Sequence, residues 1–432
     1  MKLTFYGGAS EVGRLCILLE DNQKNLLMDC GIKLGEQTEY PLLDQESLKK
    51  IRNITISHAH MDHCGYLPHI YNKGGRPKVF LTKPTRDLMG VLLADYQRIQ
   101  KEKAEKPLFT TKDVNLAMQE AKIVEYDEQF SADFKVTFRP AGHILGSALT
   151  LVEHENRRIL FSGDICMRKT RILDPCIRDL SADTLLVEST YGSKTDLIPS
   201  YRESYAKMVN IINQTLKGGG HVLIPSFAVG RAQEVLLALD DYMRSGIIIQ
   251  AKIYVDGMIG KAMKIYRHNA YYANDDIKKR ILMSEDDPFH SPNFHTPKSK
   301  TKEDVLSEPS IIVTTSGMLS GGPVLQYLPK LANNPKNTII FVGYQAEGTN
   351  GEKILSGAKT ISIDGQEIEL NMRIERVRLS GHADFNELLQ FIKGIKGLKK
   401  IFLMHGEKGD LVEALEKDYE IVRPKLLESY EI

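Results

Sequence analysis

Short runs of apolar and β-branched residues recur along the whole chain. Each run spans four or five positions, the length of a buried strand. The runs are residues 3–7, 16–19, 25–29, 53–57, 79–82, 136–139, 148–152, 158–162, 184–188, 221–225, 252–255, 311–315, 338–342, 376–379 and 400–404. Helical patterns separate many of them, so the chain is expected to have an α/β or layered α/β/α architecture.

The helical patterns have apolar residues three and four positions apart. They are residues 84–100, 112–120, 230–243 and 384–393. Asp384 stands directly before an apolar run, where residues that cap a helix N-terminus are found. Glu155 and Asn156 stand between two strand-like runs, which are therefore expected to form a hairpin.

Residues 191–370 have a βα alternation of their own. This predicts a second domain inserted into the first, so that residues 1–190 and 371–432 form one domain from two separate stretches. The chain of 432 residues is long enough for two or three domains at ~100–200 residues each. The alternation alone suggests these boundaries, because no linker-like composition marks them.

The charged residues almost cancel, with 57 Lys and Arg against 56 Asp and Glu and a net charge of +1. Composition alone therefore favours an enzyme of small metabolites over a protein that binds nucleic acid. No apolar run approaches the ~18–20 residues of a membrane helix, so no membrane partner is expected. The five cysteines contain no CxxC pair, which indicates reduced thiols and a cytoplasmic location.

Ionisable side chains of metal-ligand or acid–base type follow several of the strand-like runs. In open α/β sheets, residues just beyond the carboxyl ends of the strands line the ligand crevice. One strand followed by such a residue is common, but seven are not easily explained by chance. They are Asp29, His58, His143, Asp164, Glu188, His382 and His405.

The strongest local signal is residues 58–63, which read HAHMDH directly after an apolar strand. His58 and His60 project the same way from extended backbone and can share one metal ion. Asp62 and His63 stand where the chain turns into a helix and can serve a second ion. The alternative is a surface turn rich in histidine, but such a turn would leave these imidazoles poorly paired.

Three later residues extend this set. His143 lies in a glycine-flanked loop that lets the backbone approach a ligand, although a Gly-His loop taken alone is more often structural. Asp164 follows a buried strand and can bridge two cations; the alternative is a turn carboxylate. His405 stands at the tip of an apolar strand. Together, the histidines and shared carboxylates suit two zinc ions.

These residues resemble the metallo-β-lactamase superfamily, whose HxHxDH motif matches residues 58–63. The resemblance extends to the β-CASP nucleases of that superfamily, with Glu188 as motif A, His382 as motif B and His405 as motif C. It covers essentially the whole chain. DNA-processing members usually lack the motif C histidine, so His405 implies action on RNA.

One branch of the β-CASP ribonuclease family is the best match. Residues 188–192, 230–234 and 343–349 look most like prokaryotic, archaeal and bacterial, homologues of the endonuclease subunit of the cleavage and polyadenylation specificity factor. Ribonuclease J, the neighbouring branch, is the poorer match.

The resemblance implies a four-layered αββα metallo-β-lactamase core with an inserted α/β β-CASP domain. It also implies two Zn²⁺ ions per chain, bridged by Asp164. Asp29 would orient ligands such as His58 or His63. The ligands of one ion would be His58, His60 and His143, and those of the other Asp62, His63 and His405.

The implied activity is zinc-dependent hydrolysis of phosphodiester bonds in single-stranded RNA, in RNA processing or decay. A hydroxide activated by two metals would leave 5′-phosphate and 3′-hydroxyl ends. His382 would protonate the departing 3′-oxygen, and Glu188 would hold the tautomer of the His382 ring. The expected catalytic residues are Asp29, Asp62, Glu188 and His382. An endonuclease is favoured, while 5′→3′ exonuclease activity and a homodimer stay open.

Two other functions are compatible with parts of this pattern. A metallo-β-lactamase-fold hydrolase of a small ester or thioester would share the motif at residues 58–63, but it would lack the long insertion and the motif A and B pair. A non-catalytic RNA-binding paralogue would be expected to lose zinc ligands, and every ligand position is filled here.

Two turns between strands and helices suit phosphate handling, since free backbone N–H groups at a helix start hold anions. The expected substrate-binding residues in these turns and in residues 343–349 are Ser226, Arg231, Thr315, Ser316, Gly317 and Tyr344. Zinc ions and nearby cations would concentrate positive charge at the site. The balanced net charge therefore does not exclude RNA.

Overall fold

The computed structural model describes residues 1–35, 37–102, 107–284, 286–299, 301–407 and 409–432. They form two compact units, each built from stretches that are far apart in the chain. Unit 1 comprises Met1–Lys169, Leu173–Leu197 and Gly381–Ile432, and unit 2 comprises Thr170–Ile172 and Ile198–Ser380. The boundaries expected after residues 190 and 370 have their counterparts at Leu197 and Ser380 in this division.

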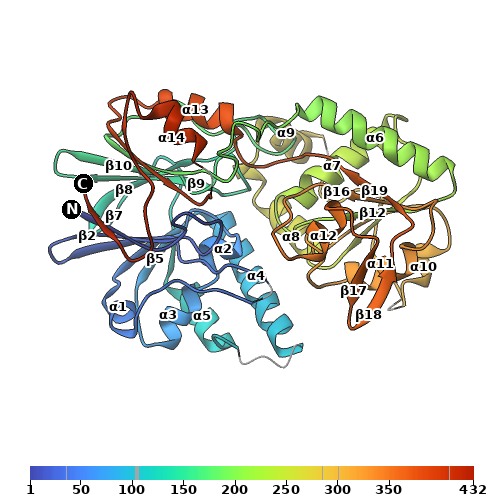
Figure 1. Ribbon diagram of the computed structural model, residues 1–432, viewed down its shortest axis with the longest axis horizontal. Helices are drawn as coiled ribbons and strands as arrows, with labels where there is room; N and C mark the ends of the chain where they lie inside the picture. Colours follow the sequence, from blue (N-terminus) through green and yellow to red (C-terminus); the bar gives the residue numbers. More distant parts are fainter. Residues whose placement is uncertain (36, 103–106, 285, 300, 408) are drawn as a thin grey trace. The chain divides into compact units, whose positions relative to one another are not determined.

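Two seven-stranded sheets form the centre of unit 1. In spatial order, the first contains β22 (Ser429–Glu431), β1 (Lys2–Gly7), β2 (Cys16–Asp21), β3 (Lys24–Met28), β4 (Asn53–Thr55), β5 (Lys78–Leu81) and β6 (Ala121–Ile123). The second contains β21 (Glu420–Val422), β20 (Lys400–Met404), β11 (Thr184–Glu188), β10 (Arg157–Phe161), β9 (Ala148–His154), β8 (Phe134–Pro140) and β7 (Gln129–Ala132). Because β1 pairs with β22, both ends of the chain lie at one sheet edge (Figure 1).

The main core of unit 1 lies between its two sheets. Leu3 and Ile17 from the first sheet share one buried cluster with Phe161 and Phe402 from the second. A separate cluster joins the other face of the second sheet to α13 (Phe385–Lys393) and α14 (Asp410–Leu415).

The other helices of unit 1 lie with the first sheet, and α1, α3 and α5 are on its outer side in Figure 1. These helices are α1 (Gln45–Lys50), α2 (Met61–Cys64), α3 (Leu67–Asn72), α4 (Lys83–Glu102) and α5 (Thr111–Glu120). The layer order is therefore helix, sheet, sheet, helix, which confirms the expected four-layered αββα core.

Unit 2 is built on one parallel sheet, with strand order β14 (Phe294–His295), β13 (Lys252–Asp256), β15 (Ser310–Thr314), β12 (Val222–Pro225), β16 (Thr338–Phe341) and β19 (Arg373–Arg376). Every residue of β12, β15 and β16 is buried, as expected for a parallel sheet covered on both faces. A small hairpin of β17 (Thr360–Ile363) and β18 (Gln366–Glu369) is separate from it.

The helices of unit 2 are α6 (Tyr201–Lys217), α7 (Arg231–Arg244), α8 (Ile259–His268), the 3₁₀ turn η1 (Ala270–Tyr272), α9 (Asp275–Met283), α10 (Glu303–Leu306), α11 (Val324–Leu331) and α12 (Asn350–Leu355). Capping groups define where helices of both units begin. Ser200 accepts a hydrogen bond from the Glu203 amide at the start of α6. Asp384 accepts one from the Glu387 amide at the start of α13, which confirms the helix start expected there.

Two local predictions have different outcomes. The hairpin expected around residues 155 and 156 is present, with His154 paired to Arg157. The strand expected at residues 376–379 is wrong, because β19 pairs with β16 and that ladder ends where Phe341 meets Arg376. The buried Val377 and Leu379 lie beyond the ladder, so their alternation reflects burial and not strand pairing.

None of the helices in the described part of the chain combines the length and the apolar character that crossing a membrane requires.

Candidate metal centre and catalytic site

Neighbouring segments of unit 1 bring the expected metal ligands together. Some of these ligands stand in the loops that follow β4, β8, β10 and β20, and the short helix α2 adds two more. The side-chain donor atoms form two groups, each within 4.8 Å. The groups are His58, His60, His143 and Asp164, and Asp62, His63 and His405.

Three imidazole nitrogens converge in the first group. Nδ1 of His60 lies 3.1 Å from Nε2 of His58 and 3.1 Å from Nε2 of His143. Oδ2 of Asp164 lies 3.4 Å from His58 Nε2 and 3.6 Å from His143 Nε2. Zinc bonds of ~2.0–2.1 Å at tetrahedral angles place neighbouring ligand atoms roughly 3.3 Å apart, so this spacing suits a zinc ion.

The second group shares Asp164 with the first. Nε2 of His405 lies 3.3 Å from Oδ2 of Asp62, and Nε2 of His63 lies 3.9 Å from the same oxygen. Nε2 of His63 is also 3.3 Å from Oδ2 of Asp164. Nδ1 of His405 is 3.4 Å from Oδ1 of Asp164. The Asp164 carboxylate therefore stands between the two groups.

Three buried atoms at this centre lack a hydrogen-bond partner within the described ranges. They are Nε2 of His63, Oδ1 of Asp164 and Nε2 of His405. Leaving buried polar atoms unsatisfied is costly, and native proteins rarely do so without a reason. Imidazole nitrogens and carboxylate oxygens are ligands that zinc accepts. The residues present therefore fit a zinc centre.

Asp29 lies behind the histidines. Nδ1 of His63 donates a hydrogen bond to Oδ2 of Asp29 at 2.6 Å. Ser57 Oγ donates to the same oxygen at 2.6 Å and accepts from Nδ1 of His58 at 3.1 Å. These bonds leave Nε2 of both rings directed at Asp164, the orienting role that carboxylates take beside metal-binding histidines. Burial raises the pKa of Asp29, and the charge of His63 opposes that shift.

Glu188, the last residue of β11, holds His382, which stands just before α13. Nδ1 of His382 donates to Oε2 of Glu188 at 2.9 Å. Oε1 of Glu188 accepts from the amide of Ile165 at 2.7 Å. Asp164, Glu188 and His382 are close enough to bind a further cation. The hydrogen bonds already engage both oxygens of Glu188 and Nδ1 of His382, however, which favours an orienting pair.

Burial and charge set the ionisation of these rings. Burial, followed by the charge of His63, lowers the pKa of His58 to about 3, so its ring is neutral. Burial also opposes the charged form of His382, but Glu188 and Asp164 outweigh it and raise the pKa of His382 to about 9. These carboxylates therefore favour the protonated ring of His382, the form that a proton donor requires.

The carboxylates around His63 favour the positively charged form of its ring, and the imidazoles around Asp164 favour its ionised form. Burial alone would raise the pKa of Asp164, but the neighbouring imidazoles, led by His63, hold it well below its ordinary range. Burial likewise opposes charge on His63, yet Asp164, Asp62 and Asp29 raise its pKa well above the usual value. In the absence of metal, a proton on His63 partly balances the three carboxylates.

The expected substrate-binding residues belong to unit 2. They follow three adjacent parallel strands, β15, β12 and β16. The amide of Ser226 donates to the carbonyl of Thr314 at 2.9 Å, so the loops after β12 and β15 lie side by side. Oγ of Ser226 is buried with no hydrogen-bond partner in the described part of the chain. The members of this edge are Ser226, Arg231, Thr315, Ser316, Gly317 and Tyr344.

Sequence reasoning missed two hydroxyl groups beside the metal ligands. Ser57 links Asp29 to His58, as described above. Oγ1 of Thr190 lies 3.3 Å from Nδ1 of His405 and donates to the His405 carbonyl at 3.2 Å. Each of these residues stands within two positions of a recognised motif residue. A search for hydroxyl side chains next to the motifs would have found both.

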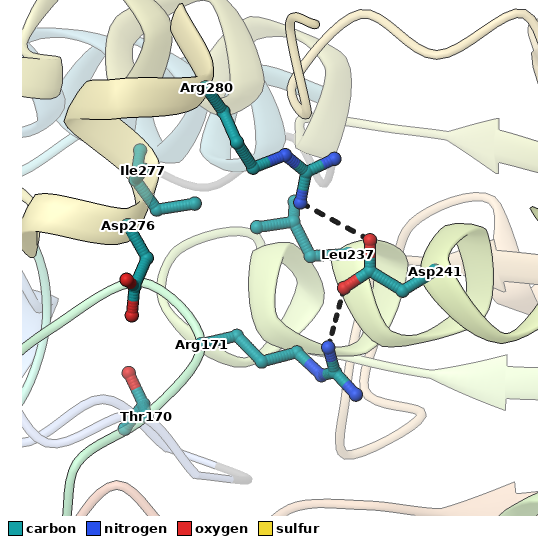
Figure 2. A pocket seen from close by; sticks show the side chains of 7 residues that line it. All are labelled: Thr170, Arg171, Leu237, Asp241, Asp276, Ile277 and Arg280. Atoms are coloured by element: carbon teal, nitrogen blue, oxygen red, sulfur yellow. Dashed lines mark hydrogen bonds and ion pairs between the residues drawn. The ribbon is translucent and has the colours of Figure 1, made fainter.

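A cavity of about 230 Å³ in unit 2 includes none of the expected site residues (Figure 2). Asp241 projects between two arginines on its wall, accepting from Arg171 at 2.5 Å and from Arg280 at 3.2 Å. The two arginines and two aspartates of the lining balance in charge, so we interpret the cavity as part of a structural ion-pair cluster. The lining residues are Thr170, Arg171, Leu237, Asp241, Asp276, Ile277 and Arg280.

Three family comparisons cover most of the chain. Residues 232–354 match the Beta-Casp domain, within unit 2. Residues 367–423 match the Zn-dependent metallo-hydrolase RNA specificity domain, and residues 2–195 match the anti-Pycsar protein Apyc1. The first two matches bear out the expected β-CASP insertion and the expected zinc dependence.

Relatives with similar sequences extend over nearly the whole chain. The chain is 36% identical over 431 residues to the transcription termination factor FttA of Methanocaldococcus jannaschii, a match that covers 96% of this chain and 68% of that protein. It is 37% identical over 434 residues to FttA of Pyrococcus abyssi, a match that covers 94% of this chain and 67% of that protein.

A solved structure of a protein of unknown function from Enterococcus faecalis V583 shares the fold, with a TM-score of 0.61, 14% identity and 99% of both chains covered. The fold, the candidate metal ligands and the relatives thus agree with one another. The chain belongs to the β-CASP family of metallo-β-lactamase-fold hydrolases and is a metal-dependent enzyme that acts on RNA.

Proposed function

We propose that this protein is a two-zinc ribonuclease that cuts single-stranded RNA internally. The proposal rests above all on the carboxylate of Asp164, which contacts the histidines of both metal-binding groups. A carboxylate between two such groups suits a pair of ions. The pair of Glu188 and His382 beside it supplies the proton chemistry that cleavage of a phosphodiester needs.

The first ion would be held by His58, His60, His143 and Asp164, and the second by Asp62, His63, His405 and Asp164. Bound zinc supplies Lewis-acid polarisation of the phosphoryl group and an acidified water as nucleophile at neutral pH. Asp29 acts through His63, and through Ser57 on His58, by fixing the ring orientations.

The proton donor in this proposal is His382. It gives a proton to the 3′-oxygen as the bond from phosphorus to that oxygen breaks, which leaves 5′-phosphate and 3′-hydroxyl products. Glu188 keeps the Nδ1 proton of His382 in place, so Nε2 is the nitrogen left to face the substrate. General acid catalysis of this kind contributes on the order of 10²–10⁴ in rate.

The loops of unit 2 after β12, β15 and β16 are proposed to bind the RNA backbone. Arg231 and the positive end of the α7 dipole supply positive character there. The unpaired Oγ of buried Ser226 supports the same role, since it is available to a phosphate oxygen.

One experiment distinguishes the cleavage modes. RNA labelled at either the 5′ or the 3′ end, with a 5′-hydroxyl or a 5′-monophosphate, is incubated with the zinc-loaded protein and resolved over time. Internal fragments from both 5′ forms support the endonuclease. Mononucleotides appearing at once, and only from the 5′-monophosphate form, would replace it with a 5′→3′ exonuclease.

The same assay tests the alternative function. A small ester or thioester hydrolase would leave both labelled RNAs intact and hydrolyse a thioester instead. The family comparisons do not favour that alternative.

The relatives are called transcription termination factors, so we propose that cleavage serves the formation of RNA 3′ ends. We propose a cytoplasmic location because the five cysteines are all buried and form no disulfide bond. A homodimer is also part of the proposal; sedimentation of the purified chain tests it.

A further inference from the structure

Arg168 lies four residues after Asp164, and its guanidinium reaches the main chain of His382. Nη2 of Arg168 donates a hydrogen bond to the His382 carbonyl at 3.0 Å. Nε of the same side chain lies 3.1 Å from Oε1 of Glu387, in the first turn of α13. The side chain is only 16% exposed. Charge-assisted contacts of this type hold a guanidinium in a defined place.

The segment that carries Arg168 contacts the pair of Glu188 and His382 at several points. Its Asp164 stands between the two metal-binding groups. The amide of Ile165 donates to Glu188 Oε1 at 2.7 Å, and the Ile165 carbonyl accepts from the Ala383 amide at 2.7 Å. Residues 164–168 thus connect the shared metal ligand with both members of the proton-donating pair.

We propose that Arg168 is a positioning residue for His382. The inference rests on the proposed function, in which His382 protonates the leaving oxygen. Glu188 restrains the ring nitrogen of His382, whereas Arg168 binds the carbonyl oxygen of the peptide that follows it and adds to the bond from the Ala383 amide to the Ile165 carbonyl. A displacement of ~1 Å at a reacting group can cost on the order of 10²-fold in rate, so a loosened peptide is enough to slow proton transfer.

A purely structural role in α13 explains these contacts less well. The start of α13 is already capped, because the Asp384 side chain accepts from the Glu387 amide at 3.1 Å and Oε2 of Glu387 accepts from the Asp384 amide at 3.0 Å. That reciprocal cap stays complete without Arg168. The bond from Arg168 to the His382 carbonyl is not part of this cap.

The test compares two substrates that differ in their need for an acid. RNA has a poor leaving group that requires protonation, whereas bis(p-nitrophenyl) phosphate releases p-nitrophenolate without it. Arg168→Met should lower kcat on RNA by on the order of 10–100-fold and leave KM unchanged. Its zinc content and its hydrolysis of bis(p-nitrophenyl) phosphate should equal those of the wild-type enzyme. Arg168→Lys should recover part of the lost kcat.

Two further variants complete the design. Arg157→Met removes an exposed arginine at the other end of β10 and should behave as wild type on both substrates. Glu387→Gln keeps an acceptor for the helix cap but removes the charge that faces Arg168, and should give a smaller loss on RNA only.

Equal losses on both substrates, loss of zinc, or no loss at all in Arg168→Met would overturn the positioning role while leaving the proposed function intact. If the wild-type enzyme hydrolysed bis(p-nitrophenyl) phosphate but no RNA, the proposed function and this inference would both fall.

Discussion

Nδ1 of His382 lies 2.9 Å from Oε2 of Glu188, although the two residues are 194 positions apart in the chain. The bond joins the end of β11 to the loop before α13, and both belong to unit 1. Neither residue is part of the two groups that bring the expected metal ligands together around Asp164. The proposed function therefore assigns proton transfer, and not metal binding, to this pair.

This separation predicts different effects for different variants. His382→Ala should reduce kcat on RNA by on the order of 10²–10⁴-fold while keeping the metal content of the wild type. Glu188→Gln should reduce kcat on RNA by a smaller factor. Its amide oxygen can still accept from the Ile165 amide, so only the charge beside His382 is removed. Steady-state kinetics together with elemental analysis of the purified variants check both. Loss of zinc in His382→Ala would show that this ring is a metal ligand.

Metal removal should destabilise the protein. The unpaired atoms of His63, Asp164 and His405 would again be buried without partners after chelation. Zinc at 100 times its Kd adds about 2.7 kcal/mol of stability by mass action, so Tm should fall on chelation and recover when Zn²⁺ is restored. Differential scanning calorimetry measures this.

A second variant makes the metal prediction specific. His405→Ala should bind about one zinc ion fewer than the wild type and show a smaller rise in Tm on adding Zn²⁺. Identical Tm values with and without chelator in the wild type would mean that the centre holds no metal in solution.

Gly31 should be essential for the metal centre although it offers no ligand atom. A Cβ at this position would overlap the carbonyl oxygen and carbon of Asp62, both backbone atoms that cannot turn away. The same carbonyl accepts from the Leu15 amide at 2.8 Å. Gly31→Ala should therefore shift α2 and weaken zinc binding by on the order of 10–100-fold, as measured by competition with a chromogenic chelator.

Gly260 provides the matched control, because a Cβ there would meet no heavy atom within 4 Å and the residue lies inside α8. Gly260→Ala should leave zinc affinity unchanged and raise stability by roughly 0.5–1 kcal/mol. Wild-type zinc affinity in Gly31→Ala would show that α2 can move without cost.

Local patterns were enough to predict the candidate metal ligands that the structure brings together. The motif at residues 58–63 needs no tertiary information, because two of its histidines project alike from extended backbone and α2 presents the next two ligands. His143, Asp164 and His405 were predicted by a different argument, since each follows a strand whose carboxyl end meets the others at one sheet edge. The α/β class follows from the alternation of strands and helices, whereas the four-layered αββα core was expected from the resemblance to the metallo-β-lactamase superfamily.

Other features could not be predicted because tertiary contacts create them. Arg168 carries no motif, and its contact with His382 spans 214 positions. The short strands at sheet edges were missed for a different reason. β7 and β22 are mostly exposed or half-buried and lack an apolar run. They are strands because they pair with a neighbouring strand, and their composition does not predict this. The strand expected at residues 376–379 was misplaced by the same kind of effect, the length of its partner β16.

Asp241 should stabilise unit 2 without influencing the metal centre. Its carboxylate accepts from Arg171 and Arg280 (Figure 2). The Arg171 guanidinium also lies 5.0 Å from the ring centres of both Tyr205 and Tyr242. Asp241→Asn leaves two cations near each other without their shared anion. The free energy of unfolding should fall by about 1–2 kcal/mol, with faster hydrogen exchange in peptides that contain Arg171 or Arg280.

An exposed ion pair is the appropriate comparison for Asp241→Asn. Asp179 and Lys396 pair at 2.8 Å in unit 1, but their side chains are 84% and 74% exposed, so solvent screens the attraction. Asp179→Asn should change stability little, and zinc content should match the wild type in both variants. Equal destabilisation by the two substitutions would indicate that charge number, and not the shared contact between Arg171 and Arg280, sets the stability of unit 2.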